Sequence, residues 1–298
     1  MLPLLRNRKD TQGRSFVEMN VKIEARDLRL RYVEADSVLL HEESDPARVK
    51  RLTSAVTNDG FLRNPPIVSA IDKHMWVVLD GATRTTMLKS LGARHIPVQV
   101  VSYDRAEVDL GAWYHVLPEQ AARETDSFVL AHTNELVNNI SPDAAKEMLE
   151  QRKGIAAIVR ENGTCAVFQI PSKTLGSPFG VLRALVSVYG GAGEIYRVVH
   201  EDLVEIVRSN SKCPEVVMFP TFTPSEIQQA ALSADLLPAG ITRHLITGRA
   251  LNMNIPLSDV LADTSLETKN TLLTSWLTTK IMEKKVRYYH EPLFVFDD

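Results

Sequence analysis

The segment Asp80-Gly81-Ala82-Thr83-Arg84 stands between the apolar run 75–79 and a helical pattern that ends at Leu91-Gly92. A glycine turn here presents free backbone N–H groups, a hydroxyl and a guanidinium at one helix N-terminus, which is a place to hold phosphate. The aspartate adds a carboxylate that can meet a metal ion or orient a hydroxyl. The segment therefore predicts an anion site beside an acid group. A simpler alternative is a tight βα connection in which Asp80 only caps the helix.

Short-range signals predict the elements that position this turn. Asp45-Pro46 is typical of a helix start, and Gly60 of its end. Pro65 and Pro66 introduce a strand, and Gly92 stops the helix that follows the glycine turn. The expected strands are 28–33, 38–40, 67–71, 76–79 and 95–102, and the expected helices are 46–59 and 83–91.

The second half of the chain reads differently from the first. Asn162-Gly163 between apolar strands at 155–160 and 164–170 is a strong hairpin signal. The other expected elements are helices over 141–152, 224–232 and 267–285, with a capping box at Thr223-Pro224-Ser225-Glu226, and a closing strand over 287–296. We therefore expect an α+β fold with a flexible N-terminal arm at 1–24, a catalytic core at 25–118 and a C-terminal substrate-binding domain at 119–298.

Composition restricts the class of protein. A chain of 298 residues with 44% hydrophobic content can bury a sizeable core, and its net charge of −3 gives no basic field to attract nucleic acid. No apolar run approaches the roughly 20 residues needed to cross a bilayer. The cysteines Cys165 and Cys213 form no CxxC pair and no disulfide framework, so we expect packed thiols and a cytoplasmic protein. No Walker loop, HExxH or GxSxG motif is present.

A series of separated motifs in one order resembles the ParB/sulfiredoxin superfamily. The matching segments are His41-Glu42-Glu43, Asn64-Pro65-Pro66-Ile67-Val68, Val78-Leu79-Asp80-Gly81 with Arg84, and Leu91-Gly92 through Ile96-Pro97-Val98. Within that superfamily, Gly111-Ala112-Trp113-Tyr114-His115 and Thr242-Arg243-His244 resemble the free-serine kinases of staphyloferrin B biosynthesis and of archaea. Sulfiredoxins carry a reactive cysteine inside the glycine turn, and this chain has none there.

The resemblance implies transfer of a phosphoryl group from ADP or ATP, with Mg²⁺, to the hydroxyl of free L-serine, giving O-phospho-L-serine. It implies Glu42 as the catalytic base, with Glu43 as the alternative, and Asp80 as a catalytic and metal-binding group. Gly81, Ala82, Thr83 and Arg84 would hold the phosphates. Ala82 and Thr83 depart from the family, in which a larger polar residue and a histidine usually stand, so here we expect contacts from backbone N–H groups, the Thr83 hydroxyl and Arg84.

The same resemblance implies where the substrate is bound. Trp113 would form a wall of the pocket. Alternation along a strand would point Thr242 and His244 the same way and Arg243 the opposite way, so we expect Thr242 and His244 to contact substrate or phosphate. Arg243 and Arg249 are weaker candidates on the same segment. Each of these residues also has an ordinary structural explanation, since a lone tryptophan most often packs in a core and an arginine most often forms a surface ion pair.

Two other functions stay open at this point. The chain could be a nucleotide-binding or DNA-associated regulator without kinase activity, although it lacks basic charge and a helix-turn-helix. It could also be a binding or scaffold protein that keeps only the fold. The partners that we expect are L-serine and a nucleotide, with no membrane and no nucleic acid, in amino-acid or siderophore biosynthesis. The sequence leaves the oligomeric state open.

Overall fold

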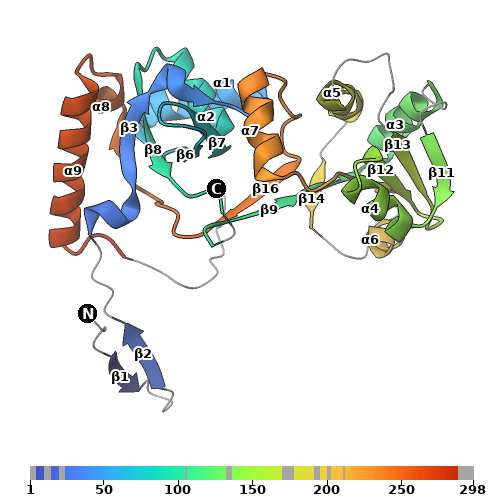
Figure 1. The fold of residues 1–298 in the computed structure, drawn as a ribbon, viewed down its shortest axis with the longest axis horizontal. Coiled ribbons are helices and arrows are strands. Elements are labelled where there is room, and N and C mark those ends of the chain that lie inside the picture. The colour runs from blue at the N-terminus through green and yellow to red at the C-terminus, as the bar shows by residue number, and fades with distance from the viewer. Residues whose placement is uncertain are drawn as a thin grey trace.

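The structure is a computed structural model that describes residues 5–9, 15–19, 24–104, 106–131, 136–169, 178–190, 195–199, 203–210 and 212–287. Two lobes lie side by side, joined by a ribbon of β9 (Val108–Ala112) and β16 (Thr242–Ile246) (Figure 1). The N-terminal strands β1 (Leu5–Lys9) and β2 (Ser15–Met19) pair antiparallel, apart from both lobes. Helices and mixed sheets alternate along the chain, which confirms the expected α+β class.

The first lobe is built on a mixed five-stranded sheet. Its order is β3 (Leu30–Glu34), β8 (His95–Val100), β6 (Ile67–Ala70), β7 (Trp76–Asp80) and β4 (Val38–Leu39). The pairs β6–β8 and β4–β7 are parallel, and β3–β8 and β6–β7 are antiparallel. The parallel β4–β7 pair puts the end of β4, which leads to Glu42, next to the strand that ends at Asp80.

Local signals explain the two helices on this sheet. Helix α1 (Pro46–Asp59) begins where the Asp45 carboxylate accepts hydrogen bonds from the N–H groups of Ala47 and Arg48. It ends at Gly60, which has a φ of 74°, in the left-handed region that glycine favours. Helix α2 (Ala82–Ser90) starts at the glycine turn as predicted. Both helices pack over a core that contains Val68, Met87 and Ile96.

C-terminal segments return to the first lobe. Helix α9 (Leu266–Met282) packs against β3, and α8 (Leu257–Leu261) lies near β8. The short pair of β5 (Phe61–Leu62) and β17 (Ile255–Pro256) joins the two parts of the chain, and α7 (Pro224–Ser233) lies against β7. Elements from beyond residue 118 therefore build part of the first lobe, along with elements of the expected core.

The second lobe is built on an antiparallel six-stranded sheet. Its order is β11 (Leu136–Ile140), β13 (Cys165–Gln169), β12 (Gly154–Arg160), β15 (Glu215–Met218), β10 (Tyr114–Leu117) and β14 (Tyr196–Val198). The helices around it are α3 (Glu119–Ala131), α4 (Pro142–Glu150), α5 (Pro178–Tyr189) and α6 (Leu203–Ser209). The largest apolar cluster extends from Val77 and Leu79 in the first lobe to Ile158 and Val217 in the second, so the lobes share one core.

Several local predictions in this half are confirmed. The Asn162-Gly163 hairpin joins β12 to β13, and Thr223 and Glu226 form the expected capping box at α7. Cys165 and Cys213 are buried free thiols. The expected closing strand over 287–296 lies, beyond its first residue, outside the described residues. None of the described helices combines the length and apolar character needed to span a bilayer.

Candidate active site

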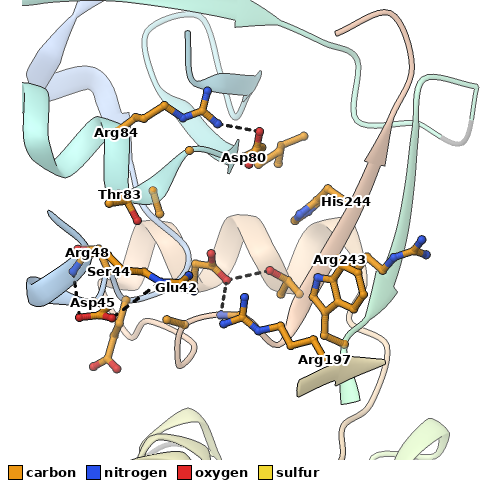
Figure 2. A pocket seen from close by; sticks show the side chains of 18 of the residues that line it. Glu42, Ser44, Asp45, Arg48, Asp80, Thr83, Arg84, Arg197, Arg243 and His244 are labelled. Carbon is orange, nitrogen blue, oxygen red and sulfur yellow. Dashed lines mark hydrogen bonds and ion pairs between the residues drawn. The ribbon is translucent and has the colours of Figure 1, made fainter. Parts of the chain in front are cut away.

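A cavity of about 590 Å³ opens between the glycine turn and the β9–β16 ribbon. It brings together all of the predicted site residues, which are Glu42, Asp80, Gly81, Ala82, Thr83, Arg84, Trp113, Thr242, Arg243 and His244. Figure 2 shows Glu42 facing the open space on one side, with the Asp80–Arg84 pair on the other. A carboxylate from before α1 and the glycine turn after β7 therefore share one pocket.

Main-chain pairing positions Glu42. The N–H of Glu43 donates to the carbonyl of Leu237, and the N–H of Leu237 donates to the carbonyl of His41, so this segment pairs with Leu237 as a parallel bridge. The Oε2 atom of Glu42 then accepts hydrogen bonds from the N–H of Gly240 at 3.2 Å and the hydroxyl of Thr242 at 3.1 Å. Glu43 is exposed and instead forms a 3.8 Å ion pair with an arginine on α5. Of the two glutamates, Glu42 is the one held at the pocket by β16.

Thr242 has a second partner behind Glu42. Its Oγ1 lies 2.9 Å from Nε2 of His41, and Nδ1 of His41 lies 2.7 Å from the carbonyl oxygen of Val78. His41 is 2% exposed and Thr242 is 8% exposed. Burial lowers the pKa of His41, and the nearby Glu42 charge acts in the opposite direction. Thr242, which was expected to contact substrate or phosphate, lines the pocket, and its hydroxyl contacts Glu42 and His41.

The glycine turn has the geometry of an anion site. Gly81 has a φ of 98°, which a side chain would strain, and it precedes α2 without any side-chain cap on the helix. The first N–H groups of an α-helix have no partner within the helix and carry the positive end of its dipole. Ala82 and Thr83 line the pocket at this helix start. Backbone groups can therefore hold phosphate although Ala82 offers no polar side chain.

Arg84 binds the protein itself as well as lining the pocket. Its Nη1 donates to the carbonyls of Asn64 and Pro65 at 3.0 Å each, and its Nη2 donates to Oδ2 of Asp80 at 2.9 Å. The same Asp80 oxygen accepts a hydrogen bond from Arg249. Two guanidinium groups thus converge on one carboxylate at the mouth of the turn. Both arginines can add positive charge next to a bound phosphate, although Asp80 already neutralises part of it.

The ribbon supplies the opposite wall of the pocket. Trp113 follows β9, and the guanidinium of Arg243 lies 5.0 Å from the centre of its ring. His244 donates to or accepts from the hydroxyl of Tyr103 at 2.7 Å. Burial, with a smaller contribution from His41, lowers the pKa of His244 to about 3, so the ring is neutral at physiological pH. His115, by contrast, lies outside the lining and contacts Tyr189 and the carbonyl of Gly240.

Sequence reasoning missed two arginines of this pocket. Arg197 on β14 and Arg48 on α1 both line it. Arg48 lies 3.9 Å from the Asp45 carboxylate, whereas no ion pair among the described residues involves Arg197. The Arg197 guanidinium packs so closely over Gly240 that a Cβ at this position would overlap it. Arg197 lies in a strand of three residues with no periodic pattern. Its isolated position in the sequence gave no signal that it would reach the pocket.

No family model matches the chain, but sequence comparison finds curated relatives. The ATP-dependent L-serine kinase SbnI of Staphylococcus aureus is 27% identical over 239 residues, which are 80% of this chain and 86% of that protein. The ADP-dependent L-serine kinase SerK of Thermococcus kodakarensis is 21% identical over 238 residues, which are 77% of this chain and 92% of that protein.

Solved structures share the fold. C-terminally truncated SbnI from Staphylococcus aureus superposes with a TM-score of 0.67 at 23% identity, over 87% of this chain and 98% of that one. A free serine kinase in complex with AMP superposes with a TM-score of 0.63 at 18% identity, over 81% of this chain and 97% of that one. The similarity therefore covers most of the chain and is not restricted to the region around the glycine turn.

Proposed function

We propose that this protein is a kinase of free L-serine that transfers the terminal phosphoryl group of ATP or ADP to the serine hydroxyl. The observation that carries the proposal is the pocket in which Glu42 faces the N-terminus of α2. Phosphoryl transfer needs a carboxylate near the attacking hydroxyl and positive charge around the phosphate. The similarity to two L-serine kinases over most of the chain supports the same reaction.

In this proposal Glu42 accepts the proton of the serine hydroxyl. The serine Oγ then forms a bond to the terminal phosphorus while the phosphoanhydride bond breaks, and the leaving nucleotide oxygen keeps the electron pair. The N–H groups at the start of α2, with Thr83 and Arg84, hold the nucleotide phosphates. The products are O-phospho-L-serine and ADP or AMP.

We further propose that Arg197 binds the carboxylate of serine. An arginine fork matches a carboxylate in two parallel hydrogen bonds, and this guanidinium reaches the pocket on the Glu42 side, away from the glycine turn. Arg48 adds positive charge nearby and lowers the pKa of Arg197, after the larger effect of burial. Trp113 closes the adjacent wall, with Arg243 over its ring. An amino acid held there would present its hydroxyl toward Glu42.

Magnesium is part of the proposal, and Asp80 is its candidate ligand. Protein sites for Mg²⁺ commonly use one or two carboxylates together with substrate phosphates. Both arginines that contact Asp80 use Oδ2, and neither contact involves Oδ1, so one oxygen of the carboxylate fits a metal ion. No cluster of three or more His, Cys, Asp or Glu side chains suited to a metal is found among the residues that the structure describes. A bound Mg²⁺ would neutralise charge on the phosphates.

The order of motifs from His41 to Val98 supports a ParB/sulfiredoxin-like core for the first lobe. We also infer a cytoplasmic reaction, because nucleotide donors are available there and the buried thiols of Cys165 and Cys213 stay reduced. Residues 119–298 contribute Arg197, Gly240 and Thr242 to the pocket, in keeping with a substrate-binding role for that part of the chain.

The experiment that tests the function is direct. Purified protein is incubated with L-serine, Mg²⁺ and either ATP or ADP, and ³¹P NMR follows the appearance of O-phosphoserine. We expect product with at least one donor and none with Glu42→Gln, which keeps the shape of the side chain without its basicity. Absence of product with both donors would overturn the proposal, and equal product from Glu42→Gln would reject Glu42 as the base.

A further inference from the structure

Behind Glu42 runs a chain of hydrogen bonds that ends in the protein interior. The Glu42 carboxylate meets the hydroxyl of Thr242 at 3.1 Å, this hydroxyl meets Nε2 of His41 at 2.9 Å, and Nδ1 of His41 meets the carbonyl of Val78 at 2.7 Å. Phosphoryl transfer itself requires only the first of these groups. His41 is 2% exposed and does not line the pocket.

The hydrogen bonds from Glu42 through Thr242 to His41 have too few hydrogens when Glu42 is ionised and His41 is neutral. The carbonyl of Val78 can only accept, so Nδ1 of His41 carries a hydrogen, and in the neutral ring Nε2 is then an acceptor. Thr242 has one hydroxyl hydrogen for two acceptors, which are Nε2 and the ionised Glu42 carboxylate. When Glu42 is charged and His41 is neutral, the Thr242 hydroxyl can therefore donate to only one of them, and its other contact is not a hydrogen bond.

One additional proton completes the chain in either of two arrangements. On Glu42, the proton donates to Thr242, which donates to His41. On His41, Nε2–H donates to Thr242, which donates to the Glu42 carboxylate. The two forms differ only by the shift of two hydrogens along the same line, so the chain gains a hydrogen bond whenever Glu42 takes up a proton.

We propose that Thr242 and His41 are positioning residues that act through Glu42, as a relay that holds the proton Glu42 removes from the acceptor hydroxyl. This inference rests on the proposed kinase function and adds the fate of the proton to it. As the serine Oγ–P bond forms and the bond from phosphorus to the leaving nucleotide oxygen breaks, the hydroxyl proton moves to Glu42. It is then shared along Thr242 toward His41 until product leaves and solvent takes it.

Titratable and charged groups from several elements face the relay. Burial lowers the pKa of His41, while the Glu42 charge raises it. His244 on β16 lies with its ring 5.3 Å from that of His41 and is neutral. Arg197 on β14 and Arg48 on α1 face the pocket near Glu42, and Asp80 lies across it with Arg84. Arg48 is also within 3.9 Å of the Asp45 carboxylate.

The first test compares Thr242→Val, which removes the hydroxyl at similar volume, with Thr242→Ser, which restores it. We expect Thr242→Val to lower kcat about 10- to 100-fold, and the acid limb of the kcat/KM profile to move down by about one pH unit. Thr242→Ser should recover most of both, and His41→Asn should shift the limb as Thr242→Val does. The control is Thr85→Val, since the buried hydroxyl of Thr85 has no partner among the described residues.

A second readout does not depend on activity. ¹⁵N NMR of the free protein should find His41 as the Nδ1–H tautomer, and Glu42→Gln should move its titration to lower pH because the glutamate charge is removed. An Nε2–H tautomer, or a titration unaffected by Glu42→Gln, would overturn the relay. So would a Thr242→Val enzyme with wild-type kcat and pH profile. A wild-type protein that makes no phosphoserine would overturn the proposed function instead, while the NMR result still decides whether the relay exists.

Discussion

The guanidinium of Arg197 packs over the α-carbon of Gly240, and the N–H of Gly240 donates to Glu42. A charged side chain from the second lobe and the candidate base in the first lobe thus meet at one glycine. Gly240 also has a φ of 80°, a conformation that glycine adopts without strain, and its lack of a Cβ leaves room for the Arg197 guanidinium. A methyl group added at Gly240 would overlap the Arg197 guanidinium.

Gly240→Ala should destabilise the protein and raise KM for serine at least tenfold, because the added methyl group displaces Arg197. Gly248→Ala is the matched control, since Gly248 has a φ of 64° with nothing within 4 Å of the position that an added methyl group would occupy. The control isolates the backbone strain, which costs about 1–2 kcal/mol. Thermal unfolding and serine kinetics measured on both variants separate strain from overlap. Equal effects in the two variants would contradict the role of the Arg197 contact.

Arg197→Gln tests the proposed carboxylate site. Loss of charge-assisted hydrogen bonds worth about 1.5–3 kcal/mol should raise KM for serine about 10- to 150-fold, with a smaller effect on KM for the nucleotide. Arg123→Gln is the control, because Arg123 pairs with Glu119 on the exposed face of α3. A rise in the nucleotide KM alone would move Arg197 from the serine side to the phosphate side of the pocket.

Arg84→Lys tests how the glycine turn is held. An ammonium group cannot reach the two carbonyls and the Asp80 carboxylate that the arginine fork holds together. We expect a loss of about 1–3 kcal/mol in the free energy of unfolding and a higher KM for the nucleotide. The control Arg63→Lys, in an exposed pair with Asp59, should change stability little. A destabilised variant with an unchanged nucleotide KM would make Arg84 purely structural.

Acid should destabilise the protein through its buried histidines. Burial lowers the pKa of His115 to about 4 and that of His244 to about 3, from 6.5. Below pH 6.5 these histidines become protonated in the unfolded chain, while the buried rings of the native protein stay neutral. The free energy of unfolding therefore falls as the pH drops toward 4. His115→Gln should reduce this slope by up to about 1.4 kcal/mol per pH unit. Denaturant titrations at several pH values measure it, and an unchanged slope would contradict the prediction.

Glu215 should affect the pH dependence of stability in the direction opposite to the buried histidines. Burial raises the pKa of Glu215 from 4.5 to about 8. Between these two pH values the carboxyl is protonated in the native protein and ionised in the unfolded chain, so the protein loses stability as the pH rises through this range. On acidification Glu215 therefore offsets part of the histidine effect. Glu215→Gln should make the loss of stability between pH 6.5 and 4.5 steeper.

Much of the first lobe could be predicted because its signals are local. Pro46 and Gly60 mark the ends of α1, and Gly81 and Gly92 bracket α2, each through a backbone preference that is visible in the sequence. The motifs that carry the family resemblance also predicted ten of the residues that line the pocket. The Asn162-Gly163 hairpin was predictable for the same reason.

The features that the sequence did not predict depend on pairing between distant segments. Leu237 reaches His41 across most of the chain, and the β9–β16 ribbon then places Thr242 behind Glu42. Strand alternation indicated only that Thr242 and His244 face the same way, and it could not show that the Thr242 hydroxyl contacts Glu42 and His41. Arg197 was missed because a three-residue strand carries no pattern, and its role depends on the empty space at Gly240.

The bridge between His41 and Leu237 also has a consequence for biosynthesis. A ribosome releases the first lobe's turn and Glu42 well before it releases β16, because domains emerge N-terminal first. A nascent chain at that stage carries the glycine turn, while the Glu42 carboxylate still lacks the Gly240 and Thr242 donors. The pocket around Glu42 can therefore take its final form only after the chain as far as Thr242 has left the ribosome.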